Sequence, residues 1–128
     1  MKETQDRIVI VAVDDMFFAS KIKAAAAHLN IIVRFIKNVA SACNVAHSGN
    51  VPLFIADLQS RTLDVYSMAE ELKSFSEFAH TRFLGFYSHV NTEVPKRALA
   101  SGFDKAMPRS AFSRNLEEIL IGKSYGEI

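Results

Sequence analysis

Residues 51–57 read VPLFIAD, and residues 8–15 read IVIVAVDD. Each is an apolar run that ends in acid, with Asp57 after the first and Asp14 and Asp15 after the second. Runs without polar alternation are typical of strands covered on both faces of a parallel sheet. Parallel strands point their carboxyl ends the same way, so the three carboxylates are expected at the ligand-binding edge of one sheet. Crowded acids repel one another unless a cation offsets them, and hard oxygen ligands favour magnesium.

The composition indicates one soluble domain with protein or small-ligand partners. The chain has 128 residues, with 15 basic and 14 acidic side chains, so no excess charge draws it to nucleic acid or to an anionic membrane. Cys43 is the only cysteine, which excludes an internal disulfide and fits a reducing compartment. The polar start is followed by an apolar stretch that is too short to span a membrane. We therefore expect a cytoplasmic protein that contacts neither nucleic acid nor membrane.

Apolar runs and amphipathic stretches alternate five times along the chain. This pattern, without Gly/Ser linkers or repeats, predicts a single domain over residues 1–122 and a C-terminal tail over 123–128. The expected strands cover residues 8–13, 31–36, 53–56, 82–87 and 105–107. The expected helices cover 16–29, 38–47, a longer stretch from Val65 past Ala79, one capped by Asn91 or Thr92 and closed by Gly102, and one capped by Ser113 with Leu116, Ile119 and Leu120 facing inward.

Five such units with right-handed crossovers predict a flavodoxin-like α/β fold. It is a doubly wound five-stranded parallel sheet in the order 2-1-3-4-5, with five helices. Strands 1 and 3 are then neighbours, which brings Asp14, Asp15 and Asp57 within reach of one ion. The loops after strands 4 and 5 add Ser88 and Arg109 to the same edge.

These motifs resemble those of a known family, the CheY-like receiver domains of two-component response regulators. The resemblance covers residues 7 to about 121. The matching motifs are Val13-Asp14-Asp15, Ile55-Ala56-Asp57, Phe86-Tyr87-Ser88 and, at the position of the family's lysine, Arg109.

The resemblance implies a phosphoprotein of a phosphorelay. Asp57 would take a phosphoryl group from a sensor histidine kinase or a phosphotransfer protein, and Ser88 and Arg109 would bind the phosphoryl oxygens. Magnesium would be held by Asp14, Asp15 and Asp57 and by the backbone carbonyl of Gln59. No substrate turnover is expected beyond phosphorylation and dephosphorylation of Asp57. The signal would pass to a downstream protein through the face of the fourth and fifth helices, which is also a plausible homodimer surface.

Several departures from the family pattern favour an alternative, a pseudo-receiver that binds proteins without depending on phosphate. Arg109 keeps the positive charge of the family's lysine but is bulkier, and it is followed by Ser110 in place of a proline. Ala106 replaces an aromatic residue that reports phosphorylation in many members. His89 stands where a small residue leaves access to the acceptor open.

Other site types are weaker interpretations. A haloacid-dehalogenase phosphatase needs a second aspartate two residues after Asp57, where this chain has Gln59. No Gly-rich phosphate loop follows the first strand, which disfavours nucleotide binding. The four histidines lack the close pairing of a zinc site. Cys43 is interpreted as a small packed residue rather than a nucleophile.

Overall fold

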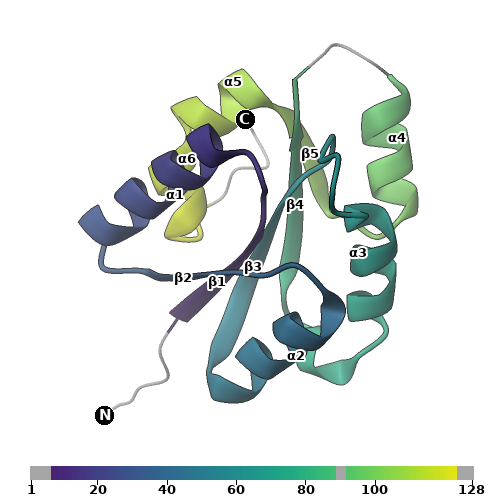
Figure 1. Cartoon of the computed structure of the whole chain (residues 1–128), viewed down its shortest axis with the longest axis horizontal. Coiled ribbons are helices and arrows are strands. Elements are labelled where there is room, and N and C mark those ends of the chain that lie inside the picture. Colours follow the sequence, from purple (N-terminus) through teal and green to yellow (C-terminus); the bar gives the residue numbers. More distant parts are fainter. Residues whose placement is uncertain (1–6, 89–91, 124–128) are drawn as a thin grey trace.

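The computed structural model describes residues 7–88 and 92–123, which form a parallel sheet flanked by helices (Figure 1). Within the described residues the sheet has five strands in the order β2-β1-β3-β4-β5, and all neighbouring pairs are parallel. The predicted fold class and strand order are therefore confirmed. The strands are β1 (Arg7–Ala12), β2 (Ile32–Phe35), β3 (Asn50–Asp57), β4 (Arg82–Tyr87) and β5 (Lys105–Pro108).

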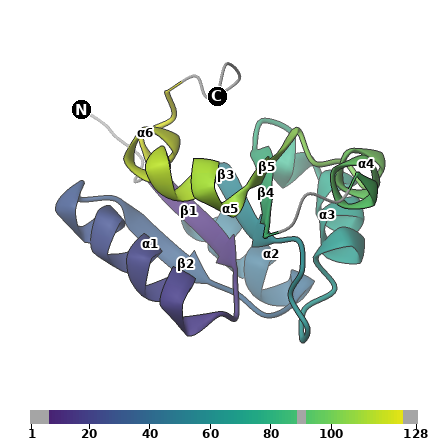
Figure 2. The same ribbon diagram turned by 90° about the horizontal axis from the view of Figure 1, so that it is seen from above.

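Helices cover both faces of this sheet. Figures 1 and 2 show α1, α5 and α6 on one face and α2, α3 and α4 on the other. The described residues contain six α-helices rather than the predicted five, and one short 3-10 helix, η1. Their bounds are α1 (Met16–His28), α2 (Val39–Ser48), α3 (Val65–Lys73), η1 (Ser76–Phe78), α4 (Glu93–Ala100), α5 (Arg109–Arg114) and α6 (Leu116–Leu120).

The sheet separates two apolar cores, as the double-sided pattern of the strands requires. On the α1, α5 and α6 side, Phe18, Phe86 and Phe112 form a ring cluster, with centroids 5.1 Å apart for Phe18–Phe86 and 4.5 Å for Phe86–Phe112. On the other side, Phe54 and Phe83 pack under α3 and α4 with centroids 4.9 Å apart. Burying such aromatic side chains is a large part of what stabilises each layer.

The strand register fixes which loops share an edge. Ala12 pairs with Ala56 in β1 and β3, and Asp57 pairs with Phe86 in β3 and β4. The chain therefore leaves β1, β3 and β4 at neighbouring points of the carboxyl edge. The acids after β1 come directly beside Asp57.

The predicted long helix after residue 65 is wrong in its extent. α3 ends at Lys73, because Phe75 has an extended backbone with φ −97° and ψ 137°. The short η1 follows and buries Phe78. Ala79, which the prediction included in this helix, lies beyond α3 and is exposed.

The predicted final helix is divided at Asn115. Ser113 lies inside α5 and is not a cap, which corrects the prediction. The Asn115 side-chain amide donates to the carbonyl of Ala111 at 2.9 Å, so it satisfies a carbonyl near the end of α5 where the backbone changes direction. The inward-facing residues were predicted correctly, since Leu116, Ile119 and Leu120 are buried.

The predictions for His89, Asn91 and most of the C-terminal tail lie outside the described residues. Within the described residues, no helix combines the length and the apolar character needed to cross a bilayer.

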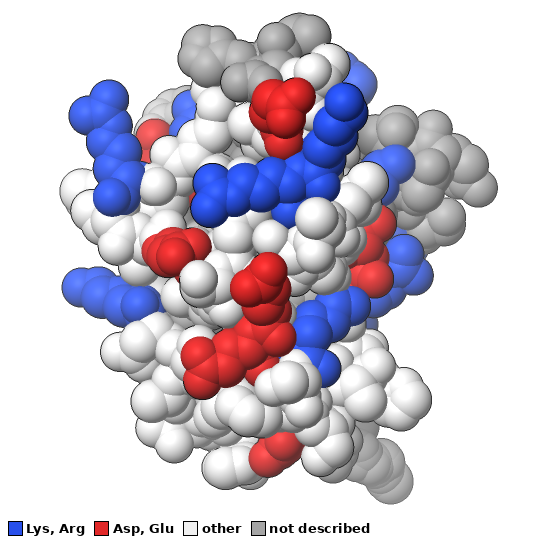
Figure 3. Space-filling model, turned by 90° about the vertical axis from the view of Figure 1, so that its right-hand side faces the viewer, with Lys and Arg blue, Asp and Glu red and all other residues white. Residues whose placement is uncertain are grey.

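The face over α3 and α4 carries interleaved charges of both signs (Figure 3). One pair on the described surface is Lys73 with Asp104, at 3.4 Å.

Candidate functional site

Asp57 is the buried acid of the site. It is the last residue of β3 and is only 2% exposed. One carboxylate oxygen accepts the backbone N–H of Gln59 at 2.9 Å, and the other lies 3.3 Å from Arg109 Nη2. Burial raises the pKa of Asp57, whereas the Gln59 N–H and the charge of Arg109 lower it. The carboxylate is therefore held in one place by an amide and a cation.

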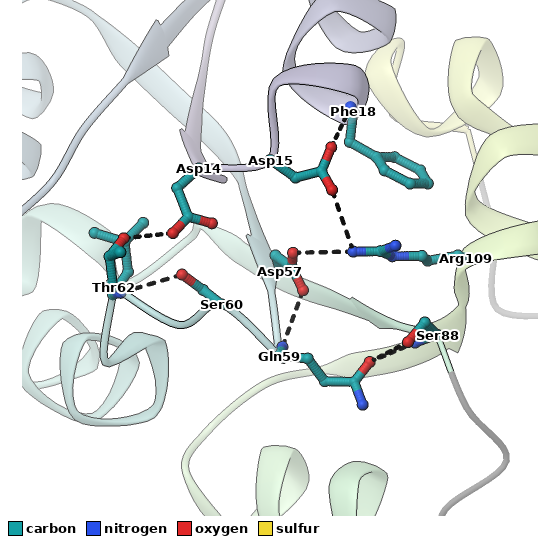
Figure 4. A network of polar contacts seen from close by, with 10 residues as sticks. Asp14, Asp15, Phe18, Asp57, Gln59, Ser60, Thr62, Ser88 and Arg109 are labelled. Carbon is teal, nitrogen blue, oxygen red and sulfur yellow. Dashed lines mark hydrogen bonds and ion pairs between the residues drawn. The ribbon is translucent and has the colours of Figure 1, made fainter.

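Arg109 bridges two of the predicted acids. It is the first residue of α5, and its Nη2 lies 3.8 Å from Asp15 Oδ2 and 3.3 Å from Asp57 Oδ2. Figure 4 shows the guanidinium between the two carboxylates. Its Cζ lies 4.6 Å from the ring centroid of Phe18 and 5.8 Å from that of Phe86. Two acids that lie far apart in the sequence thus share one guanidinium nitrogen.

The side chain of Asp15 has two contacts, one to its own helix and one to Arg109 across the cluster of Asp14, Asp15, Asp57 and Arg109, which we call the acidic pocket. It is the N-cap of α1, where its Oδ1 accepts the backbone N–H of Phe18 at 3.0 Å. Its Oδ2 is the oxygen that faces Arg109. Helix capping therefore fixes the position from which Asp15 can act on a ligand.

Asp14 turns away from this bridge. Its side chain is exposed and accepts a hydrogen bond from the hydroxyl of Thr62, in the turn after β3 (Figure 4). That hydrogen bond is the main reason why the pKa of Asp14 is lowered. The charge of Asp14 is nevertheless one of the causes that raise the pKa of Asp57, so the two carboxylates still interact electrostatically.

Gln59 connects the acid to the loop after β4. Its backbone N–H binds Asp57, and its side-chain oxygen accepts both the backbone N–H of Ser88 at 2.5 Å and the Ser88 hydroxyl at 2.8 Å. Ser88 was predicted to serve a phosphoryl group on Asp57. In this structure its hydroxyl is bound to Gln59.

The donor atoms of the pocket suit a divalent cation in their chemistry, since carboxylates and a carbonyl are the hard ligands that Mg²⁺ takes. Across residues 7–88 and 92–123, however, no three Asp, Glu, His or Cys side chains are grouped so as to hold a metal ion. Asp14 is bound to Thr62, and the other two acids face Arg109. The metal roles of Asp14, Asp15, Asp57 and the Gln59 carbonyl stay predictions.

Two residues of the site were not anticipated from the sequence. Phe18 is a core residue that is 7% exposed, and its ring also lies against the guanidinium of Arg109. Thr62 lies in the segment after β3, and its hydroxyl binds Asp14. A hydroxyl in the loop beside an acidic pair is the signal that could have indicated Thr62. Nothing in the sequence separates Phe18 from the other phenylalanines.

Comparison with known proteins gives a consistent picture of the fold. No family model and no curated protein matches this sequence. Among solved structures, the chain is similar to a response regulator from Hahella chejuensis, with a TM-score of 0.75 and 17% identity over 91% of this chain and 93% of that one. It is also similar to the receiver domain of a Pseudomonas aeruginosa PAO1 sensor histidine kinase with magnesium in its active site cleft (TM-score 0.73, 16% identity, 90% and 94% covered). A third is the chemotaxis response regulator CheY4 of Vibrio cholerae (TM-score 0.72, 14% identity, 92% and 98% covered).

These similarities span nearly the whole chain, and the five-stranded parallel sheet in the order β2-β1-β3-β4-β5 agrees with them. The chain therefore has the fold of the receiver domains of response regulators, as its motifs predicted.

Proposed function

We propose that this chain is a receiver-type signalling domain that accepts a phosphoryl group on Asp57 and passes the signal on by protein contact. The observation that carries the proposal is the placement of Asp57. It is a buried carboxylate at the end of the central strand β3, held between the Gln59 amide and Arg109. The receiver fold supports a role in phosphorelay signalling.

The proposed chemistry is transfer from a phosphohistidine on a partner protein. A carboxylate oxygen of Asp57 attacks phosphorus, a P–O bond forms, and the P–N bond breaks. The departing imidazole keeps the bonding electron pair and takes up a proton. Arg109 offsets negative charge on the phosphoryl oxygens, and Ser88 donates its hydroxyl once Gln59 releases it.

Magnesium is the proposed cofactor. Asp15, Asp57 and the Gln59 carbonyl would hold it, together with Asp14 directly or through water. When bound, it would supply further positive charge for the phosphoryl oxygens. The structurally similar P. aeruginosa receiver domain is described with magnesium coordinated in its active site cleft. The donor chemistry of the present pocket suits the same ion.

The proposed partners are a sensor histidine kinase or phosphotransfer protein and a downstream protein target, which implies a cytoplasmic location. The proposed output face comprises α4, β5 and α5, and it could also join two copies of the chain. Leu99 on this face is 57% exposed although it is apolar. Figure 3 shows charges of both signs on the face over α3 and α4, which suits a protein partner better than a nucleic acid.

A second candidate is a pseudo-receiver that binds its partner without phosphorylation. Two contacts favour it: Arg109 already bridges Asp15 and Asp57, and Gln59 already holds the Ser88 hydroxyl. Both contacts occupy groups that phosphoryl transfer needs.

Amide NMR spectra recorded with MgCl₂ and beryllofluoride, and separately with acetyl phosphate, distinguish the two candidates. Phosphoryl acceptance predicts shifts around Asp57 and Ser88 and along α4 and β5, and it predicts their loss in Asp57→Asn. The matched control is Asp64→Asn, at the exposed N-cap of α3, which should leave the response intact. A wild-type spectrum that does not change, together with partner binding that survives Asp57→Asn, would establish the pseudo-receiver.

A further inference from the structure

The acidic pocket contains a cation that belongs to the chain itself. Arg109 Nη2 lies within 4 Å of a carboxylate oxygen of Asp15 and of Asp57, the two acids that come from different strand ends. Opposite charges at this separation attract each other, most strongly where one partner is buried, as Asp57 is. The positive charge that the crowded acids require is thus already present without an ion from solution.

Aromatic rings fix the guanidinium in this position. Its Cζ lies 4.6 Å from the ring centroid of Phe18 and 5.8 Å from that of Phe86, within the range of cation–π attraction. Arg109 Nε is buried and has no hydrogen-bond partner among the described residues. Hydrogen bonding of the guanidinium is therefore incomplete. The group is held mainly by its ion pairs and by the two aromatic rings.

Phe18 is itself firmly placed. Its backbone N–H is bound by Asp15, and its ring stacks on Phe86 with centroids 5.1 Å apart. The same short segment thus supplies an acid of the pocket and the ring that holds the cation against that acid. A lysine could not form this arrangement in the same way, because its compact ammonium lacks the flat face and the fork of a guanidinium.

The geometry points to Arg109 as the resident cation of the pocket, which competes with a divalent cation for the carboxylates of Asp15 and Asp57, with Phe18 as its positioning residue. This inference deepens the proposed function, because it concerns the ion that the phosphoryl acceptor would use. For Mg²⁺ to bind both carboxylates, the guanidinium must give up at least one of its ion pairs. The wild-type protein therefore binds Mg²⁺ weakly, and its pocket keeps its arrangement without metal.

The test is a titration with MgCl₂ alone, followed by amide NMR shifts in the segments after β1 and β3. Arg109→Gln should bind Mg²⁺ at least about ten-fold more tightly than the wild type, which corresponds to about 1.4 kcal/mol. Its matched control is Arg114→Gln, which removes the same charge from an exposed position on α5. That control should leave the affinity within about two-fold.

Phe18→Leu tests the positioning role. It should tighten Mg²⁺ binding about three-fold or more, because the guanidinium loses its nearer ring. Phe112→Leu is the control, since Phe112 is buried in the same ring cluster, whereas the ring contacts of Arg109 are with Phe18 and Phe86. The dispersed amide spectrum of each variant confirms that it is folded.

Equal Mg²⁺ affinity in the wild type and Arg109→Gln overturns the inference, as does a lack of binding in both. Equal effects of Phe18→Leu and Phe112→Leu overturn the role of Phe18. The proposed function is judged separately by the response to beryllofluoride and acetyl phosphate. Tighter Mg²⁺ binding in Arg109→Gln with no such response would uphold the inference and refute the phosphoryl acceptor.

Discussion

Removing Arg109 should destabilise the fold chiefly by leaving Asp57 buried without its cation. Breaking a fully buried ion pair from one side costs about 3–5 kcal/mol, whereas an exposed pair contributes about 0–1 kcal/mol. Here the Asp57 side chain is 3% exposed and that of Arg109 is 31% exposed, so the pair lies between these limits. We expect Arg109→Gln to lower the free energy of unfolding by about 2 kcal/mol.

A double-mutant cycle separates this charge effect from lost packing. In the Asp57→Asn background no buried carboxylate is left to pair, so the same arginine substitution should cost only about 0.5–1 kcal/mol for the contact with the rings. The coupling energy between the two positions is then about 1–1.5 kcal/mol. Urea unfolding in metal-free buffer with EDTA gives the free energy of unfolding of the wild type, the two single variants and the double variant. Unchanged m-values check that unfolding stays two-state.

Two outcomes would contradict this reasoning. If the effects of the two substitutions add to within about 0.5 kcal/mol, the 3.3 Å contact carries no net energy. If the surface control Arg114→Gln destabilises the protein as much as Arg109→Gln, the loss reflects net charge or helix propensity rather than the pocket.

Three further predictions concern the surroundings of the pocket. Gln59→Ala should release the Ser88 hydroxyl and backbone N–H from their shared acceptor. Amide hydrogen exchange should then be faster at Ser88. Unchanged exchange would mean that the contact is not kept in solution. Thr62→Val should raise the pKa of Asp14 towards its ordinary value, as followed by carboxyl-carbon NMR titration. Because the pKa of Asp14 is depressed in the folded state, the stability that this hydrogen bond gives the wild type is present at a pH above the pKa of Asp14 in the unfolded chain. That stability is lost as the pH falls through the pKa of Asp14 in the folded protein. A pKa of Asp14 that does not move in Thr62→Val would show that Thr62 is not the cause of the depression. Gly85→Ala should destabilise the protein by about 1–3 kcal/mol in urea unfolding, because the added methyl would lie 2.5 Å from a buried leucine side chain, and a neutral effect would show that this side chain moves aside readily.

The sheet could be predicted from the sequence because β1, β3 and β4 are nearly pure apolar runs. Their alternation with amphipathic stretches determines the order of the units, and the β4 bounds were predicted without error. The helix ends were harder. The helix ends at the extended backbone of Phe75 and at Asn115 depend on local hydrogen bonding and packing. The spacing of apolar residues does not predict such ends.

The gathering of Asp15, Asp57 and Arg109 could also be predicted, because topology alone brings the loops after β1, β3 and β5 to one edge. Their individual partners could not. Whether an acid faces a cation, caps a helix or accepts from a hydroxyl depends on side-chain rotamers. Only the structure shows that Asp14 binds Thr62 and that Gln59 binds Ser88.

The hydrogen bonds of Gln59 have a consequence for the energetics of any anion that arrives at the loop after β4. Ser88 offers two donors there, and both already share a neutral amide oxygen. An incoming oxyanion must therefore substitute one acceptor for another and does not fill an open position. The net gain in binding free energy is the difference between hydrogen bonds to a charged acceptor and hydrogen bonds to an uncharged one. This loop therefore adds only modestly to the affinity for an anion.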